Sequence, residues 1–156
     1  MKHLRLAAMA FALGVAVPAQ ARDQSAPINN AGLTGVERGR YLVRIMGCND
    51  CHTEGFAERN ADVAEQKWLT GSKLGFSGPW GTTYASNLRL YFSRLTEDQW
   101  VKVGQTVTMR PPMPWFNLQA MNEGDLRSMH QYVRALGPAG HEAPTFLPPG
   151  KTARGP

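Results

Sequence analysis

The chain has 156 residues, of which 17 are Lys or Arg and 12 are Asp or Glu, so its formal net charge is +5. This length suits one domain with short appendages. The basic residues do not cluster among stacking aromatic residues, so a nucleic-acid-binding surface is not expected. Both cysteines lie in one short motif, which excludes a framework of several disulfides.

The first 21 residues have the composition of a secretory signal peptide. Lys2 and Arg5 precede an apolar run over residues 6–17, and Ala19-Gln20-Ala21 matches a cleavage motif. The run is shorter than the roughly 20 residues that cross a bilayer, which favours cleavage over a retained membrane anchor. This segment holds two of the 17 basic residues and no acidic residue, so residues 22–156 carry a net charge of +3. We expect an exported, periplasmic protein whose mature chain has no transmembrane segment.

A flexible lead-in over residues 22–33 is predicted to precede the first helix. Thr34 and Glu37 have the spacing of a capping box, which predicts that a helix begins there. Gly39 inside this helix costs about 1 kcal/mol relative to Ala, and either a close helix crossing or simple tolerance would account for it. The helix is predicted to end near Gly47. Its residues expected to pack inward are Val36, Leu42, Val43 and Met46.

Directly after this helix comes the sequence Cys48-Asn49-Asp50-Cys51-His52. Two thiols three residues apart, followed at once by an imidazole, match the attachment motif of haem c. Each thiol would form a thioether with one vinyl group of the porphyrin, and His52 would bind the iron from the proximal side. The alternatives are a disulfide, a thioredoxin-like pair or half of a zinc site. Zinc needs further ligands, and the thioredoxin pair needs a βαβ context that the sequence does not show.

The middle of the chain is predicted to lack long helices and strands. Residues 53–77 predict a long irregular segment with a helical turn near residues 61–68, and a loop of this length is expected to wrap something or to carry function. Residues 78–87 are rich in turn-forming residues. Trp80, Tyr84 and Asn87 carry N–H or O–H donors that need partners when buried. We expect haem propionates as those partners, with ordinary turn chemistry as the alternative.

Two more helices are predicted. Thr96 with Gln99 indicates a capped helix to about residue 104, and Asn122 indicates the start of a last helix that stops at Gly137. Between them, three prolines within residues 109–115 exclude a regular helix. Residues 138–156 are rich in Pro and Gly and predict an extended tail that lies on the surface or is disordered. The apolar stripe of the last helix comprises Leu126, Met129, Val133 and Leu136.

A haem iron held by His52 needs a second axial ligand. The candidates are Met109, Met113, Met121, Met129, His130 and His141. Met129 belongs to the inward stripe, His130 points about 100° away from it and is expected to face solvent, and His141 lies in the tail. Met113 stands in a stiff Pro-Met-Pro frame and is the predicted ligand, with Met121 as the alternative. His/Met ligation raises the reduction potential, and His/His ligation or an open position is also possible.

Several segments resemble class I monohaem cytochromes c and the cytochrome c subunits of periplasmic dehydrogenases. The resemblance spans about residues 35–137, and Leu147-Pro148-Pro149-Gly150 also looks like the tails of relatives. Dehydrogenase subunits often carry three haem motifs and a C-terminal anchor, whereas this sequence shows one motif and no anchor. The matching segments are Gly39-Arg40-Tyr41-Leu42, Cys48–His52, Pro79–Asn87, Met113-Pro114-Trp115, Met121–Leu126 and Tyr132–Leu136.

The resemblance implies an all-α, cytochrome c-like fold of three to four helices, with long irregular loops around one covalently attached haem, over residues 34–137. It implies that the first and last helices cross near the haem edge, with Gly39 against Tyr132. His52 would be the proximal ligand, Met113 the distal ligand, and residues 80–87 would lie near the propionates.

These expectations favour an electron carrier over an enzyme. It would pass single electrons between a dehydrogenase or respiratory complex and a downstream acceptor, through transient protein contacts, with no catalytic residue and no small-molecule substrate. One alternative is a haem enzyme or gas-binding protein with a labile sixth ligand. Another is a fixed electron-transfer subunit of a dehydrogenase complex.

Overall fold

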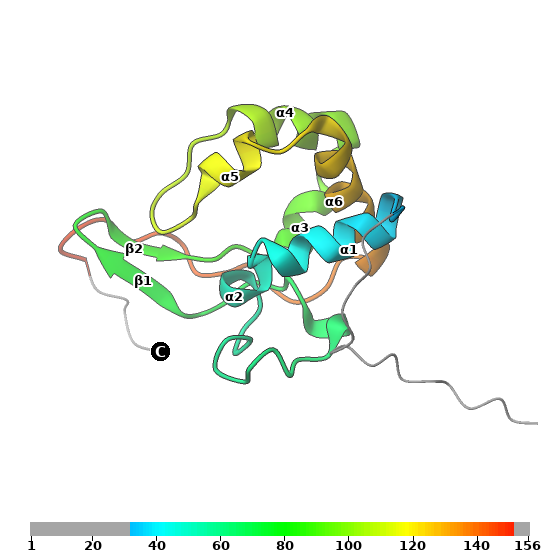
Figure 1. Ribbon diagram of the computed structural model, residues 1–156. Coiled ribbons are helices and arrows are strands. Elements are labelled where there is room, and N and C mark those ends of the chain that lie inside the picture. Colours follow the sequence, from blue (N-terminus) through cyan, green and yellow to red (C-terminus); the bar gives the residue numbers. More distant parts are fainter. Residues whose placement is uncertain (1–31, 152–156) are drawn as a thin grey trace, which may run out of the picture.

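The computed structural model describes residues 32–151, which form a helix-rich chain with one small sheet (Figure 1). The predicted signal peptide and residues 22–31 of the predicted lead-in lie outside the described residues. A single 3-10 turn spans Glu65–Lys67, and the strands are β1 (Gly75–Gly78) and β2 (Gly81–Tyr84). The α-helices are α1 (Gly35–Ile45), α2 (Cys48–His52), α3 (Leu88–Ser93), α4 (Glu97–Thr106), α5 (Trp115–Gln119) and α6 (Glu123–Leu136).

Helix α1 has the bounds that the sequence predicts, with two differences in detail. Thr34 is the N-cap residue, but its side chain makes no capping hydrogen bond, so the predicted capping box does not form. Leu42 and Val43 are buried as predicted, whereas Val36 is 44% exposed because it stands in the first turn, at the outer end of the helix.

Gly39 lies at a close crossing of α1 and α6, which confirms the first explanation of its place in a helix. A Cβ atom at residue 39 would lie 2.0 Å from the backbone oxygen of Ser128 and 2.6 Å from the Cβ atom of Tyr132. Next to the crossing, Arg38 of α1 donates hydrogen bonds of 2.8 and 3.1 Å to the carboxylate of Asp125 in α6. The missing side chain therefore sets how closely the two longest helices approach.

The sheet corrects the prediction of an all-α chain of three to four helices. β1 and β2 pair antiparallel, with Gly75 opposite Tyr84 and Gly78 opposite Gly81, so residues 79–80 form the turn. Glycine is depleted in strands, and three glycines in eight strand residues make the local pattern look like a turn-rich loop. Helices α2, α3 and α5 are also additional to the prediction, because each has fewer than two turns and too few residues to show helical periodicity.

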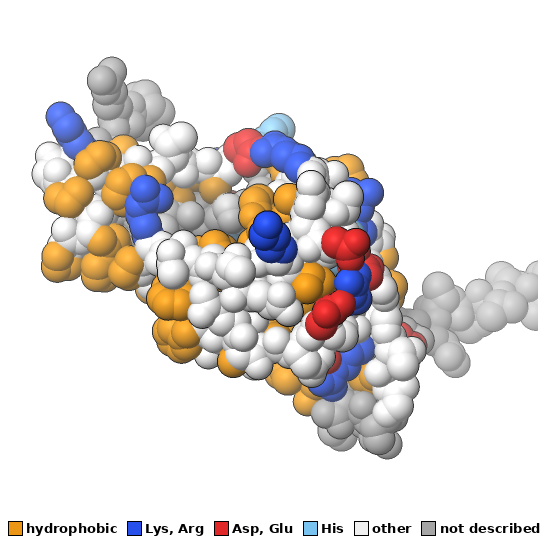
Figure 2. All heavy atoms as spheres, turned by 90° about the horizontal axis from the view of Figure 1, so that it is seen from above, with side chains coloured by type: hydrophobic (Ala, Val, Ile, Leu, Met, Phe, Trp, Pro, Cys, Tyr) orange, Lys and Arg blue, Asp and Glu red, His pale blue; other side chains and the backbone are white. Residues whose placement is uncertain are grey.

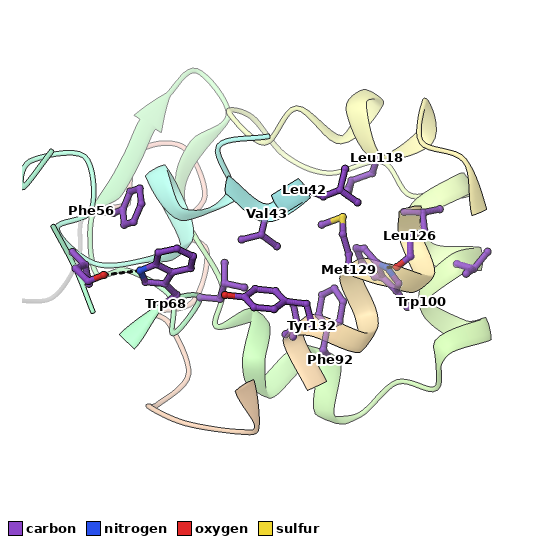
Figure 3. Packing of buried hydrophobic residues seen from close by; sticks show 14 residues of the cluster. Leu42, Val43, Phe56, Trp68, Phe92, Trp100, Leu118, Leu126, Met129 and Tyr132 are labelled. Carbon is purple, nitrogen blue, oxygen red and sulfur yellow. Dashed lines mark hydrogen bonds between the residues drawn. The ribbon is translucent and has the colours of Figure 1, made fainter. Parts of the chain in front are cut away.

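Residues 53–74 are irregular, as predicted, and they contribute buried side chains to the same hydrophobic core as the helices. The indole N–H of Trp68 donates a 2.7 Å hydrogen bond to the Val63 carbonyl, and the ring of Phe56 meets the Trp68 ring edge-on at a centroid distance of 5.8 Å. Leu69 is fully buried beside them. Figure 3 shows Phe56 and Trp68 at one end of this core.

Both predicted later helices form. Thr96 and Gln99 make the full capping box at the start of α4, with the Thr96 Oγ1 accepting from the Gln99 N–H at 3.2 Å. Asn122 caps α6 by accepting a 2.8 Å hydrogen bond from the Asp125 N–H, and α6 ends at Gly137. The main core lies where α1, α4 and α6 meet, and it includes Leu42, Val43, Trp100, Leu126, Met129 and Tyr132 (Figure 3).

The prediction that His130 faces solvent is wrong. Its side chain is buried, its Nε2 lies 3.0 Å from the Leu95 carbonyl oxygen, and its ring packs 5.8 Å from that of Phe92. The error has a simple cause, since α6 packs against α1 on one side and against α3 and α4 on another. A single apolar stripe therefore describes only part of its buried surface.

Charged and hydroxyl groups fasten the irregular segment to the helices. Glu65 accepts 2.8 Å hydrogen bonds from Arg40 of α1 and from the Tyr132 hydroxyl of α6. Burial acts to raise the pKa of Glu65, but these two hydrogen bonds outweigh it and hold that pKa below its usual value. Arg89 of α3 is buried and donates to the backbone carbonyls of Gln66, Leu136 and Gly137, so it closes the C-terminal end of α6.

The described part of the tail, residues 138–151, lies along the surface as predicted. The Asn87 side-chain amide donates to the carbonyls of Ala139 (2.8 Å) and His141 (3.1 Å).

None of the helices within residues 32–151 is long and apolar enough to cross a membrane.

Candidate cofactor site

A cavity of about 800 Å³ opens between α2, β2 and the segment that joins α4 to α5. Cavities of this size are typical of sites for small molecules and cofactors. Its walls are mostly apolar and include core residues such as Phe92, Trp100 and Val133. In the space-filling view, hydrophobic side chains border a hollow on the face seen from above (Figure 2).

The Cys-x-x-Cys-His motif lies on the wall of this cavity. Gly47 adopts a left-handed conformation (φ +69°) that ends α1 and starts the single turn of α2. Residues three and four positions apart share a helix face, so Cys48, Cys51 and His52 all face the same space and line it. The spacing in the sequence thus produces the convergence that haem attachment requires.

The imidazole of His52 is held in one orientation. Its Nδ1 lies 2.8 Å from the carbonyl oxygen of Ser86. A carbonyl oxygen only accepts, so Nδ1 carries the proton and Nε2 keeps its lone pair. Burial lowers the pKa of His52, and the hydrogen bond to Ser86 opposes this only in part. His52 is therefore neutral at physiological pH, the form in which an imidazole binds a metal ion.

Both cysteines are free thiols in this structure. Burial raises the pKa of the Cys48 thiol to about 12, and burial together with the Asp50 carboxylate raises that of Cys51. Thioredoxin-like pairs depend on a lowered thiol pKa. These surroundings disfavour the thioredoxin alternative, and the only sheet within residues 32–151 is the antiparallel hairpin rather than part of a βαβ unit.

The far wall carries two thioethers. Met109 and Met113 both line the cavity, in the segment that Figure 1 places across from α2. Residues 111, 112 and 114 are prolines, which stiffen the backbone around Met113. Met129 also lines the cavity but belongs to the core, whereas Met121 packs against the core and is not among the described lining residues.

Of the three residues expected near the propionates, the structure brings only Tyr84 to the cavity wall. Trp80 closes the hairpin, with its indole N–H directed at the Phe76 carbonyl oxygen 3.4 Å away. Asn87 accepts a 3.0 Å hydrogen bond from the Leu90 N–H at the start of α3, and its amide hydrogens are used by the tail. For Trp80 and Asn87 the structure favours turn and capping chemistry.

Thr83 is a site residue that the sequence analysis does not single out. Its Oγ1 is buried, lacks a hydrogen-bond partner and belongs to a residue that lines the cavity. Buried polar atoms nearly always have a partner, so this hydroxyl is suited to a polar group of a bound molecule. Thr83 lies opposite Phe76 in the hairpin, and both line the cavity.

Searches of protein-family models, curated proteins and solved structures find no match for this chain. Within residues 32–151, no group of three or more His, Cys, Asp or Glu side chains lies close enough together to hold a bare metal ion. The nitrogen and sulfur donors at the cavity are instead one imidazole, two thiols and four thioethers, those of Met46, Met109, Met113 and Met129. This set would suit a metal that arrives inside an organic macrocycle, because thiols could attach the macrocycle and the protein would then supply only axial ligands.

Proposed function

We propose that this chain is an exported, periplasmic c-type cytochrome of the class I monohaem family that carries single electrons between a dehydrogenase or respiratory complex and a downstream acceptor. Its fold would then be cytochrome c-like, wrapped around one covalently attached haem c. The observation that carries the proposal is the convergence of Cys48, Cys51 and His52 on the wall of one apolar cavity, with the Nδ1 of His52 turned to the Ser86 carbonyl.

The residues of the cavity have separate tasks in this proposal. Cys48 and Cys51 would hold the macrocycle through two thioether bonds, and His52 would present Nε2 to the metal while the Ser86 carbonyl fixes its ring. Thr83 Oγ1 would donate a hydrogen bond to a carboxylate of the bound group. A haem held there supplies an iron that alternates between the ferrous and ferric states.

The charge around the cavity fits a partner protein with an acidic face. Residues 66–96 and 99–122, which supply most of the cavity wall, contain no Asp or Glu. Arg110 lies among the described lining residues, and the side chain of Phe116 is 59% exposed in α5. A partner with an acidic docking face would complement this surface, so we expect docking to weaken as the salt concentration rises.

The function is tested by expressing the full chain with a cytochrome c maturation system. The purified protein should have the mass of its peptide plus one haem, show reversible one-electron reduction, and bind no carbon monoxide in the reduced state. Material that is colourless after correct maturation would refute the proposal. Carbon monoxide binding would instead favour the gas-binding alternative, and co-purification with a dehydrogenase would favour the fixed-subunit alternative.

Met113 is expected to supply the second axial ligand. Met113→Ala should lower the reduction potential by on the order of 0.1 V, within the roughly 0.8 V that axial ligands span, and should allow imidazole to bind the ferric protein. Met109→Ala and Met121→Ala are matched controls that remove a thioether nearby and should leave the potential within about 0.02 V of the wild-type value. A large fall with Met109→Ala and none with Met113→Ala would move the assignment to Met109.

A further inference from the structure

The tail runs back to the hairpin and pairs with it. Thr82 and Leu147 exchange two backbone hydrogen bonds, of 2.8 and 3.0 Å, so Leu147 forms an antiparallel bridge to β2. This contact joins a residue near the C-terminal end of the described chain to a strand that lines the cavity. The tail is thus fixed in place at the hairpin and does not only rest on the surface.

Gly81 gives the tail room beside the hairpin. Its φ is +104°, and a Cβ atom there would lie 2.1 Å from the Leu147 carbonyl oxygen and 3.1 Å from the ring of Phe146. Any side chain at residue 81 would push the tail away. The close approach places the Phe146 ring beside the start of β2 in a defined position.

The Phe146 ring in turn contacts the segment that carries Met113. The guanidinium carbon of Arg110 lies 4.0 Å from the centroid of the Phe146 ring, which is a cation–π contact. The Arg110 carbonyl accepts a 3.2 Å hydrogen bond from the Met113 N–H, so both residues belong to one turn. Two prolines separate them and fix φ at both intervening positions. A contact that holds Arg110 in place therefore also restricts the movement of Met113.

We propose that the tail is a strap (residues 138–151) that positions the distal loop (residues 109–114): Phe146, seated on Gly81, holds Arg110 and thereby keeps the Met113 thioether at the cavity wall. Phe146 and Arg110 are positioning residues, and the strap acts on the site through Met113. The inference rests on the proposed function, since it assigns the strap a role in retaining the sixth ligand. The inference goes beyond that function because it assigns a positioning role to residues 138–151.

The test uses the full-length holoprotein with imidazole as the competing ligand. Phe146→Ala should raise the affinity of the ferric protein for imidazole about two- to fivefold, the factor that an exposed cation–π contact corresponds to. Hydrogen exchange of the Met113 N–H, measured by mass spectrometry of its peptide, should speed up by a similar factor. Phe146→Tyr keeps the ring and should restore both values, and Arg110→Gln should reproduce the effect of Phe146→Ala from the other side.

Glu142→Gln is the matched control, because it removes the exposed ion pair with Arg94 from the same tail without touching the loop. The inference is overturned if Phe146→Ala and Arg110→Gln behave like Glu142→Gln in both measurements. Because Arg110 is exposed, its variant should fold even if Phe146→Ala does not. A protein that lacks covalent haem would refute the proposed function. The hydrogen-exchange measurement does not need iron, so it would still show whether the strap holds the distal loop.

Discussion

Gly39→Ala should destabilise the protein by at least about 3 kcal/mol. The new methyl group would stand 2.0 Å from the Ser128 backbone oxygen and 2.6 Å from the Tyr132 Cβ atom, and neither can rotate away because both are fixed in α6. Overpacking in a core costs typically 1–3 kcal/mol and more when backbone must move, which exceeds the gain of about 1 kcal/mol from replacing glycine in a helix. Urea unfolding followed by circular dichroism measures the change.

Gly124→Ala provides the control for helix propensity. Gly124 lies in the first turn of α6, and a Cβ atom there would approach only the Asn122 side chain, at the ordinary distance of 3.4 Å. This variant should be as stable as the wild type or more stable by up to about 1 kcal/mol. If Gly39→Ala were equally harmless, the close crossing of α1 and α6 would be wrong.

The helices that the sequence predicts are those whose signals are local. Helices α4 and α6 are predictable from their N-cap residues, and α6 also from its apolar periodicity and from Gly137 at its C-terminal end. The hairpin, α3 and α5 are stabilised by contacts with distant segments, such as the pairing of Thr82 with Leu147 and the bonds of Asn87 to the tail. Apart from Asn87, which caps α3, their own few residues do not distinguish them from loops, so the sequence alone does not predict them.

The same division applies to the candidate site. Cys48, Cys51 and His52 are predictable because their convergence needs only one turn of helix. Ser86, which orients His52 from 34 residues away, and Thr83, whose hydroxyl lacks a partner, reach the cavity only through the tertiary fold. The wall opposite the motif falls between these cases. The Pro-Met-Pro frame singles out Met113, whereas the fact that Met109 also lines the cavity appears only in three dimensions.

Cys48→Ser combined with Cys51→Ser should abolish covalent haem attachment. Serine hydroxyls cannot form the two thioether bonds, so the mature protein should have the mass of its peptide alone and lose its haem band on a denaturing gel. Stability should fall as well, because the cavity wall includes Phe92, Trp100 and Val133 of the main core, and an unfilled cavity of about 800 Å³ leaves them in contact with water or with nothing.

Two single variants separate attachment from ligation. His52→Ala keeps both thiols, so it should retain haem mass but lose the spectrum of a six-coordinate iron, since no other described imidazole lines the cavity. Asp50→Asn changes an exposed residue of the same turn and should keep both the mass and the spectrum. If the double cysteine variant kept the wild-type mass and colour, the motif would not be an attachment site. A different result would be a wild-type protein that lacks haem and forms a reversible disulfide between Cys48 and Cys51. That result would favour the thioredoxin-like alternative, which the raised pKa values of the two buried thiols disfavour.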